Sequence, residues 1–172
     1  NRVAKHVYSD GSWINSTYFM RDAQGNVMSI YRHENDNTTQ TQSFAQIERS
    51  IYGSSRIGME KTKVELIGAP PVDTTKSVRV LGNKEFEGSN HLGNILTTFT
   101  DKKIPIDFDN NGQTDFYWPH VVSSTDYYPF GMEKPGRCFS SGEYKYGYSG
   151  MEKTDEVSGS GNEYTTEFRQ YD

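Results

Sequence analysis

The chain has 172 residues, a formal net charge of −5 and a mean hydropathy of −0.83. Because no lysine or arginine cluster offsets this acidic balance, the sequence lacks the electrostatic footprint of a nucleic-acid-binding protein. No apolar run approaches the roughly 18 residues of a membrane span, and the single cysteine excludes an internal disulfide framework. No signal peptide is recognisable, and a chain that opens on Asn1 is expected to be an interior piece of a longer protein.

The aromatic content favours an all-β fold. Twelve Tyr, nine Phe and two Trp stand in a chain that is 33% hydrophobic, so rings are expected to form much of the buried layer. Short runs of aromatic and β-branched residues alternate with Gly, Asn, Asp and Ser, as in strands joined by tight turns. The expected strands are residues 16–20, 27–31, 78–81, 95–100 and 115–122.

The connecting segments are less uniform. Residues 41–52, "TQSFAQIERSIY", place Phe44, Ile47 and Ile51 three to four apart, which leaves a helix and a strand both open. Residues 35–42 are expected to form a polar loop, and residues 61–76, with Pro70 and Pro71, a connection, because proline removes ladder donors. Residues 157–162, "VSGSGN", read as a flexible turn.

One pattern occurs twice. Residues 18–27, "YFMRDAQGNV", and residues 86–95, "FEGSNHLGNI", both read aromatic, three residues, Asp or Asn, two residues, Gly, Asn and a β-branched residue. Asp or Asn at the start of a turn bonds back to the backbone, and glycine adopts the positive φ of a bulged hairpin. The pattern therefore predicts two similar β-hairpins and a repeated sheet.

These two units resemble the YD repeat of Rhs proteins, and the chain as a whole resembles the Rhs repeat-associated core as it occurs in Bacteroidota. Five motifs appear in the order that the family shows. They are "YFMRDAQGNVMSIY" (18–31), "IYGSSRIGM" (51–59), "SNHLGNILTTFTDKK" (89–103), "DYYPFGMEKPGR" (126–137) and "YKYGYSGMEKTDEV" (144–157).

The resemblance implies a large hollow β-shell, spiralled from YD-repeat hairpins and closed at one end by the core. On this basis residues 1–60 are YD-repeat hairpins, residues 61–84 a Pro-containing connection and strand, and residues 85–172 a core that is incomplete at its C-terminal end. In toxin-type members the shell encloses a variable C-terminal toxin. An aspartate-type autoprotease segment, located downstream of the core, separates that toxin. This chain ends at Tyr171-Asp172, so the resemblance gives no ground for placing a cleavage site within it.

The function implied is that of a structural, non-enzymatic fragment of such a shell, which encapsulates or presents a C-terminal effector of a secreted or surface-exposed bacterial protein. The implied partners are the remainder of the same chain, the effector, and a type 6 or type 9 secretion apparatus. A cell-surface adhesin or carbohydrate-binding β-module is the first alternative. The second is part of an aspartate-type autoprotease whose cleavage segment lies beyond Asp172.

The motif with the most specific chemistry is "DFDNNGQTD", residues 107–115. Its spacing, D-x-D-x-N-G-x-x-D, supplies the oxygen ligands that Ca²⁺ requires, and Gly112 permits the turn that would wrap them around the ion. The twelfth position holds Trp118 where an EF-hand has Glu. The motif therefore resembles the shorter calcium loops that connect β-strands. The alternative is an acidic hairpin turn that binds no ion. The candidate metal ligands are Asp107, Asp109, Asn111, Gln113 (through its carbonyl) and Asp115.

Other reactive residues suggest no site. The four histidines have no metal-ligand spacing, and Cys138 beside Arg137 is expected to be a plain small residue. The acidic residues of the C-terminal part allow two interpretations, a catalytic acid–base pair and an ordinary polar surface. A carbohydrate platform competes with ring packing inside a sheet, and packing is expected. The candidates for the acid–base pair are Glu143, Glu152, Asp155 and Glu156. The rings that would form the carbohydrate platform are Tyr117, Trp118, Tyr127 and Tyr128.

Residues 124–132, "STDYYPFGM", predict a structural corner. Asp126 is expected to begin a turn, Pro129 to fix φ, and Gly131 to permit the reversal. The three rings of this stretch are expected to anchor the corner by packing.

Overall fold

The computed structural model describes residues 2–36, 41–68, 79–141, 144–153, 164–165 and 170–171. Within these residues the chain is all-β, and its one helical element is the three-residue 3₁₀ turn η1 (Tyr148–Gly150). The chain divides into two compact units, Asn1–Asn83 and Lys84–Asp172. In the described part of the chain, no helix has the length and hydrophobicity needed to cross a bilayer.

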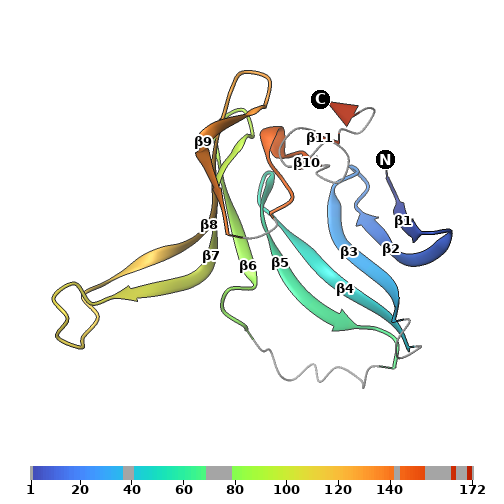
Figure 1. Ribbon diagram of the computed structural model, residues 1–172, viewed down its shortest axis with the longest axis horizontal. Coiled ribbons are helices and arrows are strands. Elements are labelled where there is room, and N and C mark those ends of the chain that lie inside the picture. The colour runs from blue at the N-terminus through green and yellow to red at the C-terminus, as the bar shows by residue number, and fades with distance from the viewer. Residues whose placement is uncertain are drawn as a thin grey trace. The chain divides into compact units, whose positions relative to one another are not determined.

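The first unit is a five-stranded antiparallel meander, in which each strand pairs with the next one along the chain (Figure 1). Phe19 lies opposite Ile30 on the neighbouring strand, and both side chains are buried. Ala45 and Met59 are the other buried apolar side chains among the described residues of this unit. The strands are β1 (Ala4–Ser9), β2 (Ser12–Arg21), β3 (Val27–Asp36), β4 (Thr41–Tyr52) and β5 (Arg56–Glu65).

The second unit contains a four-stranded antiparallel meander and a small three-stranded sheet. Its buried residues combine Ile95, Tyr144 and Tyr146 with several hydroxyl side chains. Thr98 and Ser123 lie opposite each other in the sheet, and their buried hydroxyl oxygens are 2.6 Å apart. The strands are β6 (Lys84–Ser89), β7 (Ile95–Ile106), β8 (Phe116–Tyr127), β9 (Glu133–Ser140), β10 (Glu152–Lys153), β11 (Tyr164–Thr165) and β12 (Gln170–Tyr171).

The sheet of the first unit carries a layer of rings, as the composition predicts. The rings of Tyr18 and Tyr31 both contact Phe44, with centroids 6.1 and 5.9 Å apart. Trp13 and His33 are 4.9 Å apart between centroids on neighbouring strands. Cross-strand ring pairs of this kind stabilise a sheet beyond the area that they bury.

Several sequence-based predictions are confirmed and others are wrong. Residues 16–20, 27–31, 95–100 and 116–122 lie in strands, and residues 41–52 form strand β4 rather than a helix, because the Phe44 ring packs across neighbouring strands. Of the strand predicted at residues 78–81, the described residues 79–81 form no strand, since the chain turns at residues 81–82. Residues 61–65 belong to β5, not to a connection.

The predicted polar loop at 35–42 begins and ends inside strands, because Asn35 pairs with Gln42 and Asp36 with Thr41. Residues 37–40, Pro70 and Pro71, and residues 157–162 lie outside the described residues.

The repeated sequence pattern folds into the same turn twice. In the first copy the Asp22 N–H donates to the Asn26 carbonyl (3.0 Å), and the Gly25 N–H donates back to the Asp22 carbonyl (3.1 Å). The Asp22 carboxylate also accepts bonds from the N–H groups of Gln24 (2.9 Å) and Asn26 (2.8 Å). Gly25 has φ +91°, the left-handed conformation that glycine adopts without strain.

The second copy repeats each of these bonds. The Asn90 N–H donates to the Asn94 carbonyl and the Gly93 N–H donates to the Asn90 carbonyl, both at 3.0 Å. The Asn90 side-chain oxygen accepts from the N–H groups of Leu92 (2.9 Å) and Asn94 (3.0 Å), and Gly93 has φ +81°. An amide oxygen thus replaces a carboxylate oxygen in an otherwise identical turn.

Two further turns have the same backbone bonds without an Asp or Asn at the first position, and the sequence pattern does not find them. In both, the residue before the glycine also has positive φ, +78° at Phe130 and +51° at Ser149. Their bonds run from Tyr128 N to Met132 O (2.8 Å), Gly131 N to Tyr128 O (3.1 Å), Gly147 N to Met151 O (3.0 Å) and Gly150 N to Gly147 O (3.0 Å).

The predicted corner at residues 124–132 is therefore a hairpin turn between β8 and β9. The turn begins at Tyr128, whereas Asp126 lies within β8 and forms an ion pair with Arg137 (2.9 Å). Of the three rings expected to pack, that of Tyr127 contacts the Tyr148 ring, with centroids 5.8 Å apart, and its hydroxyl donates to the Ile95 carbonyl (3.0 Å). Phe130 is 78% exposed, so the expectation that its ring anchors the corner is wrong.

We predict that Gly131→Ala is much more destabilising than Gly93→Ala. Both glycines have positive φ, so both substitutions introduce backbone strain of about 1 kcal/mol or more. A Cβ at position 131 would also lie 2.8 Å from the Tyr148 ring, whereas a Cβ at position 93 would meet nothing within 4 Å. Urea unfolding should show a loss of about 3 kcal/mol for the first variant, and equal losses would contradict the steric argument.

We also predict a pH dependence that originates at Asp22. The side-chain hydrogen bond from Asn26 (2.9 Å), helped by backbone N–H groups and opposed by slight desolvation, lowers the pKa of Asp22 below its ordinary value of 3.8. Because its pKa is lowered, the ionised Asp22 carboxylate stabilises the fold above pH 3.8. This stabilisation is lost as the pH falls through the folded-state pKa.

The variant Asp22→Asn keeps the acceptor oxygen, as Asn90 does in the second turn, but cannot titrate. It should lose less stability than the wild type between about pH 6 and about pH 3. Carboxyl NMR titration measures the pKa directly, and an Asp22 value at or above 3.8 would refute the assignment.

Candidate metal site at the tip of the β7–β8 hairpin

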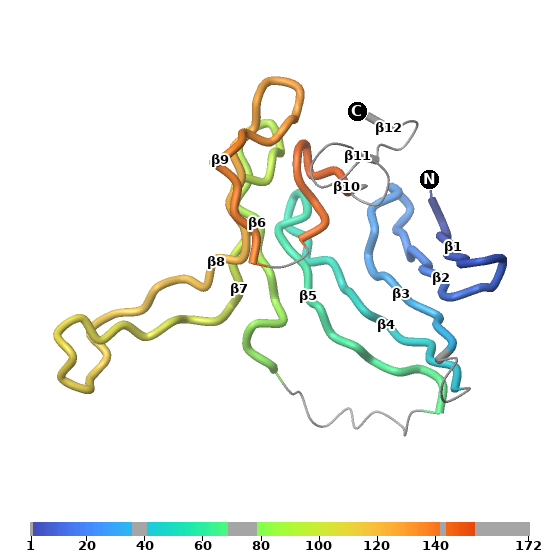
Figure 2. Tube along the Cα trace, viewed as in Figure 1, coloured from blue at the N-terminus to red at the C-terminus, as the bar shows by residue number. Residues whose placement is uncertain are grey.

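Strands β7 and β8 extend well beyond their neighbours in the second unit and form a projecting two-stranded ribbon (Figure 2). Strand β6 pairs with β7 only as far as Thr100, and β9 pairs with β8 only from Ser123 onward. Beyond these points the two strands pair only with each other in the described chain, and residues 108–119 are all exposed. Residues 101–121 are called the arm below.

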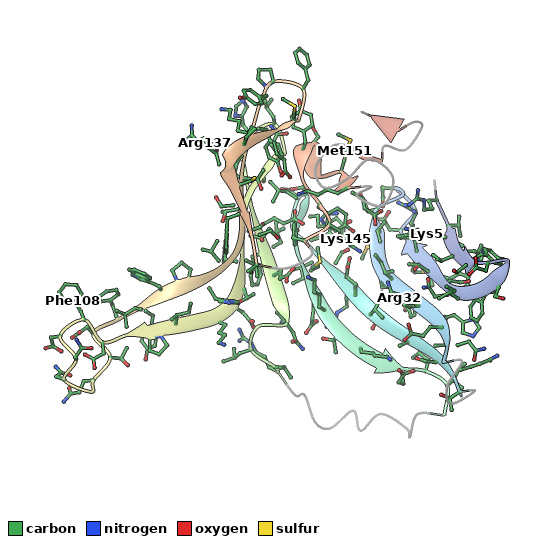
Figure 3. The ribbon with its side chains drawn as sticks, in the orientation of Figure 1. Lys5, Arg32, Phe108, Arg137, Lys145 and Met151 are labelled. Carbon is green, nitrogen blue, oxygen red and sulfur yellow. The ribbon has the colours of Figure 1, made fainter. Side chains whose placement is uncertain are left out.

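The tip of the arm is the predicted calcium loop. The carboxylates of Asp107, Asp109 and Asp115 each place an oxygen within 4.8 Å of the other two. Asp109 and Asp115 are exposed and Asp107 is half-buried. Figure 3 shows the adjacent residue, Phe108, at the end of the arm. The structure therefore brings together the three carboxylates among the five residues that the sequence pattern selects.

Backbone N–H groups hold the three carboxylates in place. Asp107 accepts from the N–H groups of Asn111 (3.1 Å) and Gly112 (2.7 Å), and Asp115 accepts from the Phe108 N–H (2.8 Å). The Asp115 N–H in turn donates to the Ile106 carbonyl (2.9 Å), which closes the loop at its base. Oxygen ligands that are held by the backbone do not need to be ordered when an ion binds.

The other two candidate ligands have different roles in this conformation. The Asn111 side chain donates to Asp109 (2.9 Å), and its oxygen accepts from the Gln113 N–H (2.8 Å). Gly112 has φ +84° and Asn110 has φ +58°, whereas Asn111 has no positive φ, so the chain does not reverse through the two-residue turn that the Asn111-Gly112 pair predicts. Asn111 thus organises the loop by hydrogen bonds.

The donor set fits a calcium ion. Calcium binds oxygen at about 2.3–2.6 Å, so two ligand oxygens on opposite sides of one ion lie roughly 5 Å apart. A spacing within 4.8 Å among three carboxylates matches this limit. Three like charges this close also repel one another, and a divalent cation would relieve that repulsion. A hard cation that prefers carboxylate and carbonyl oxygens is the metal that this chemistry suits.

The four rings proposed as a carbohydrate platform do not form one surface. Adjacent strand residues point to opposite faces, which separates Tyr117 from Trp118, and Tyr127 is half-buried with its hydroxyl bonded to the Ile95 carbonyl. The expectation that the rings pack inside the sheet is also wrong for three of them. Tyr128 is 43% exposed, and Tyr117 (60%) and Trp118 (58%) are exposed because the arm has no layer covering either face in the described residues.

The other reactive side chains contribute no further site in the described residues. His6 Nδ1 lies 2.7 Å from the Ser16 hydroxyl, a serine–histidine pair that sequence spacing does not reveal. Ser16 is only 2% exposed and its oxygen also accepts from the Trp13 indole N–H (2.8 Å), so no substrate can reach it. Cys138 is exposed, and Glu152 lies in β10. Glu143, Asp155 and Glu156 lie outside the described residues.

We predict that the arm binds Ca²⁺ through these carboxylates. Calorimetric titration of the chain after treatment with EDTA should show one site, and Asp109→Ala should weaken binding by about tenfold or more, because it removes one charged ligand. Asp10→Asn, which removes a carboxylate from a turn of the first unit, is the matched control and should bind like the wild type. Equal affinity in the wild type and Asp109→Ala would eliminate the site.

Comparison of the chain with protein-family models, with curated proteins and with solved structures finds no match. The resemblance to Rhs proteins therefore stays a prediction from the five sequence motifs.

Proposed function

We propose that the chain is a structural, non-enzymatic part of a β-walled shell of the Rhs type, which encapsulates or presents a C-terminal effector of a secreted or surface-exposed bacterial protein. The observation that carries this proposal is the hairpin turn that occurs four times with the same pair of backbone hydrogen bonds. A wall built from repeats requires one type of turn that recurs, because the strands of each repeat must pair in the same register.

The meander topology supports the proposal. Every strand of each meander pairs with its sequence neighbour, so a further hairpin can be added at an end without rearranging the strands already present. In such a wall the exposed edges of outer strands are covered by the next repeat of the same chain. The partners in this proposal are the remainder of the chain and the effector, with a type 6 or type 9 secretion apparatus for export.

Features of the described residues favour a structural role over catalysis. The hydroxyl groups in the two units are largely used to satisfy one another or the backbone, as in the contacts of Thr97 and Thr98 with Ser123. The calcium loop would serve the same role, because an ion that neutralises the carboxylates at the tip fixes the end of the arm. An adhesin and an autoprotease with its cleavage segment beyond Asp172 are the competing functions.

Limited proteolysis of the intact protein that carries this chain tests the proposal. Encapsulation predicts that the segment following the chain is cleaved much more slowly than the same segment expressed alone, with mass spectrometry identifying the fragments. Gly131→Ala should abolish this protection if it opens the wall, whereas Tyr128→Phe, in the same turn, should preserve it. Equal cleavage of the segment inside and outside the intact protein would overturn encapsulation.

A further inference from the structure

We propose that Asn111, at the tip of the arm, is a deamidation site that Asp107 and Asp109 protect by hydrogen bonds to the groups that would react. Asparagine is one of the thermolabile residues of proteins, and Asn111 is the one asparagine of the sequence that precedes a glycine. Because glycine lacks a Cβ, its backbone nitrogen can approach the side chain of the preceding asparagine with little steric hindrance.

The two asparagines of the recurring turn provide a contrast. Asn26 precedes Val27 and Asn94 precedes Ile95, and a β-branched side chain is stiff and crowds the nitrogen that would attack. The Ile95 N–H also donates to the Gly147 carbonyl (3.2 Å). These two asparagines are therefore expected to persist where Asn111 reacts.

The reaction at Asn111 requires only water. Hydroxide takes the proton of the Gly112 N–H, and the nitrogen forms a bond to Asn111 Cγ. The Cγ–Nδ2 bond then breaks, and Nδ2 leaves as ammonia after it takes a proton from water. Water opens the resulting cyclic imide at either carbonyl and gives aspartate or isoaspartate. One water is consumed and one ammonia is released, with no oxidant or reductant.

Solvent has access to the reacting groups. Residues 108–119 are all exposed, and a Cβ at Gly112 would meet nothing within 4 Å. Burial therefore does not protect this peptide bond, and protection must come from the contacts of the loop itself.

Hydrogen bonds restrain both reacting groups. The Gly112 N–H donates to the Asp107 carboxylate (2.7 Å). The Asn111 side chain donates to Asp109 (2.9 Å) and accepts from the Gln113 N–H (2.8 Å). Before the nitrogen can attack Cγ, the Gly112 N–H must leave Asp107 and the Asn111 amide must rotate away from Asp109. Bonds to charged acceptors are strong, so their loss raises the barrier.

The charge of the loop acts in the same direction. The attack places negative charge on the Asn111 amide oxygen, in a loop where three carboxylates already lie within 4.8 Å of one another. Like charges at such distances repel. All three carboxylates contribute to this repulsion, whereas only Asp107 and Asp109 bond the reacting groups. Asp115 therefore separates the effect of charge from that of hydrogen bonding.

Deamidation would change the tip permanently. It replaces the amide nitrogen that donates to Asp109 by an oxygen that cannot donate when ionised, and it adds a fourth negative charge to the loop. Isoaspartate also lengthens the backbone by a methylene group. The modified loop would lose the contacts by which Asn111 organises it.

Mass spectrometry of the 172-residue chain, incubated at constant pH in EDTA, measures the reaction. A peptide of residues 105–117 gives the rate without the fold, and Asn111 should react at least about tenfold more slowly in the chain. Asp107→Ala should accelerate the reaction in the chain about tenfold, because it releases the Gly112 N–H. Equal rates in chain and peptide, or no acceleration by Asp107→Ala, would overturn the proposal.

Asp107→Asn and Asp115→Ala are the matched controls. The first removes the charge but retains an oxygen that can accept from the Gly112 N–H. The second removes a carboxylate that accepts from the Phe108 N–H (2.8 Å) and bonds neither reacting group. Both should react more slowly than Asp107→Ala, with circular dichroism verifying that each variant keeps its β-structure. Equal rates in all three would assign the protection to charge alone and refute the role of the hydrogen bonds. Because EDTA is present throughout, the result does not depend on the calcium site.

Discussion

A turn closed by two backbone hydrogen bonds recurs along this chain and reverses its direction. At four places in the described residues, the N–H of one residue donates to the carbonyl four residues later, while the N–H of the third residue on donates back. The second bond requires a glycine with positive φ, and each of the four turns has one. Where strands enter and leave such a turn, the register of the hairpin follows, and with it the face on which each side chain lies.

The register determines where the rings and hydroxyls of the chain gather. In the first unit the β2–β3 register, set at the Asp22 turn, places Tyr18 opposite Tyr31, and the β3–β4 register places His33 opposite Phe44. In the second unit the β7–β8 register, set by a different loop, places Thr98 opposite Ser123, so that two buried hydroxyls satisfy each other. A slip of one residue would turn these side chains to the other face and leave buried polar groups without partners.

The turns with Asp or Asn at the first position could be predicted from sequence, because that side chain bonds the backbone locally and independently of the rest of the fold. The turn at Gly147 could not, and the turn at Tyr128 was predicted as a corner from Pro129 and Gly131 but with its start wrongly placed at Asp126. Their first residues have no such side chain, and the turn at Tyr128 includes the contact of the Gly131 backbone with the Tyr148 ring, a residue distant in sequence. Local chemistry is visible in a sequence, and packing between distant segments is not.

The same distinction holds for the candidate sites. The spacing of Asp107, Asp109 and Asp115 predicted that their carboxylates would converge, since the loop is short and the geometry local. The exposure of Trp118 was not predictable, because it arises where β7 and β8 extend beyond their neighbours β6 and β9. Likewise, residues 41–52 form a strand despite their helical spacing, because the Phe44 ring contacts Tyr31 on β3 and Tyr18 on β2.

The pairing of every strand with its sequence neighbour has a kinetic consequence. Almost all ladder contacts in the two meanders join residues that are close along the chain, so the contact order is low for a β protein. The entropy cost of closing long loops before strands can pair is therefore small. Each hairpin can therefore form as soon as its second strand has been synthesised, without waiting for residues still inside the ribosome. Growth of the sheet would then keep pace with translation.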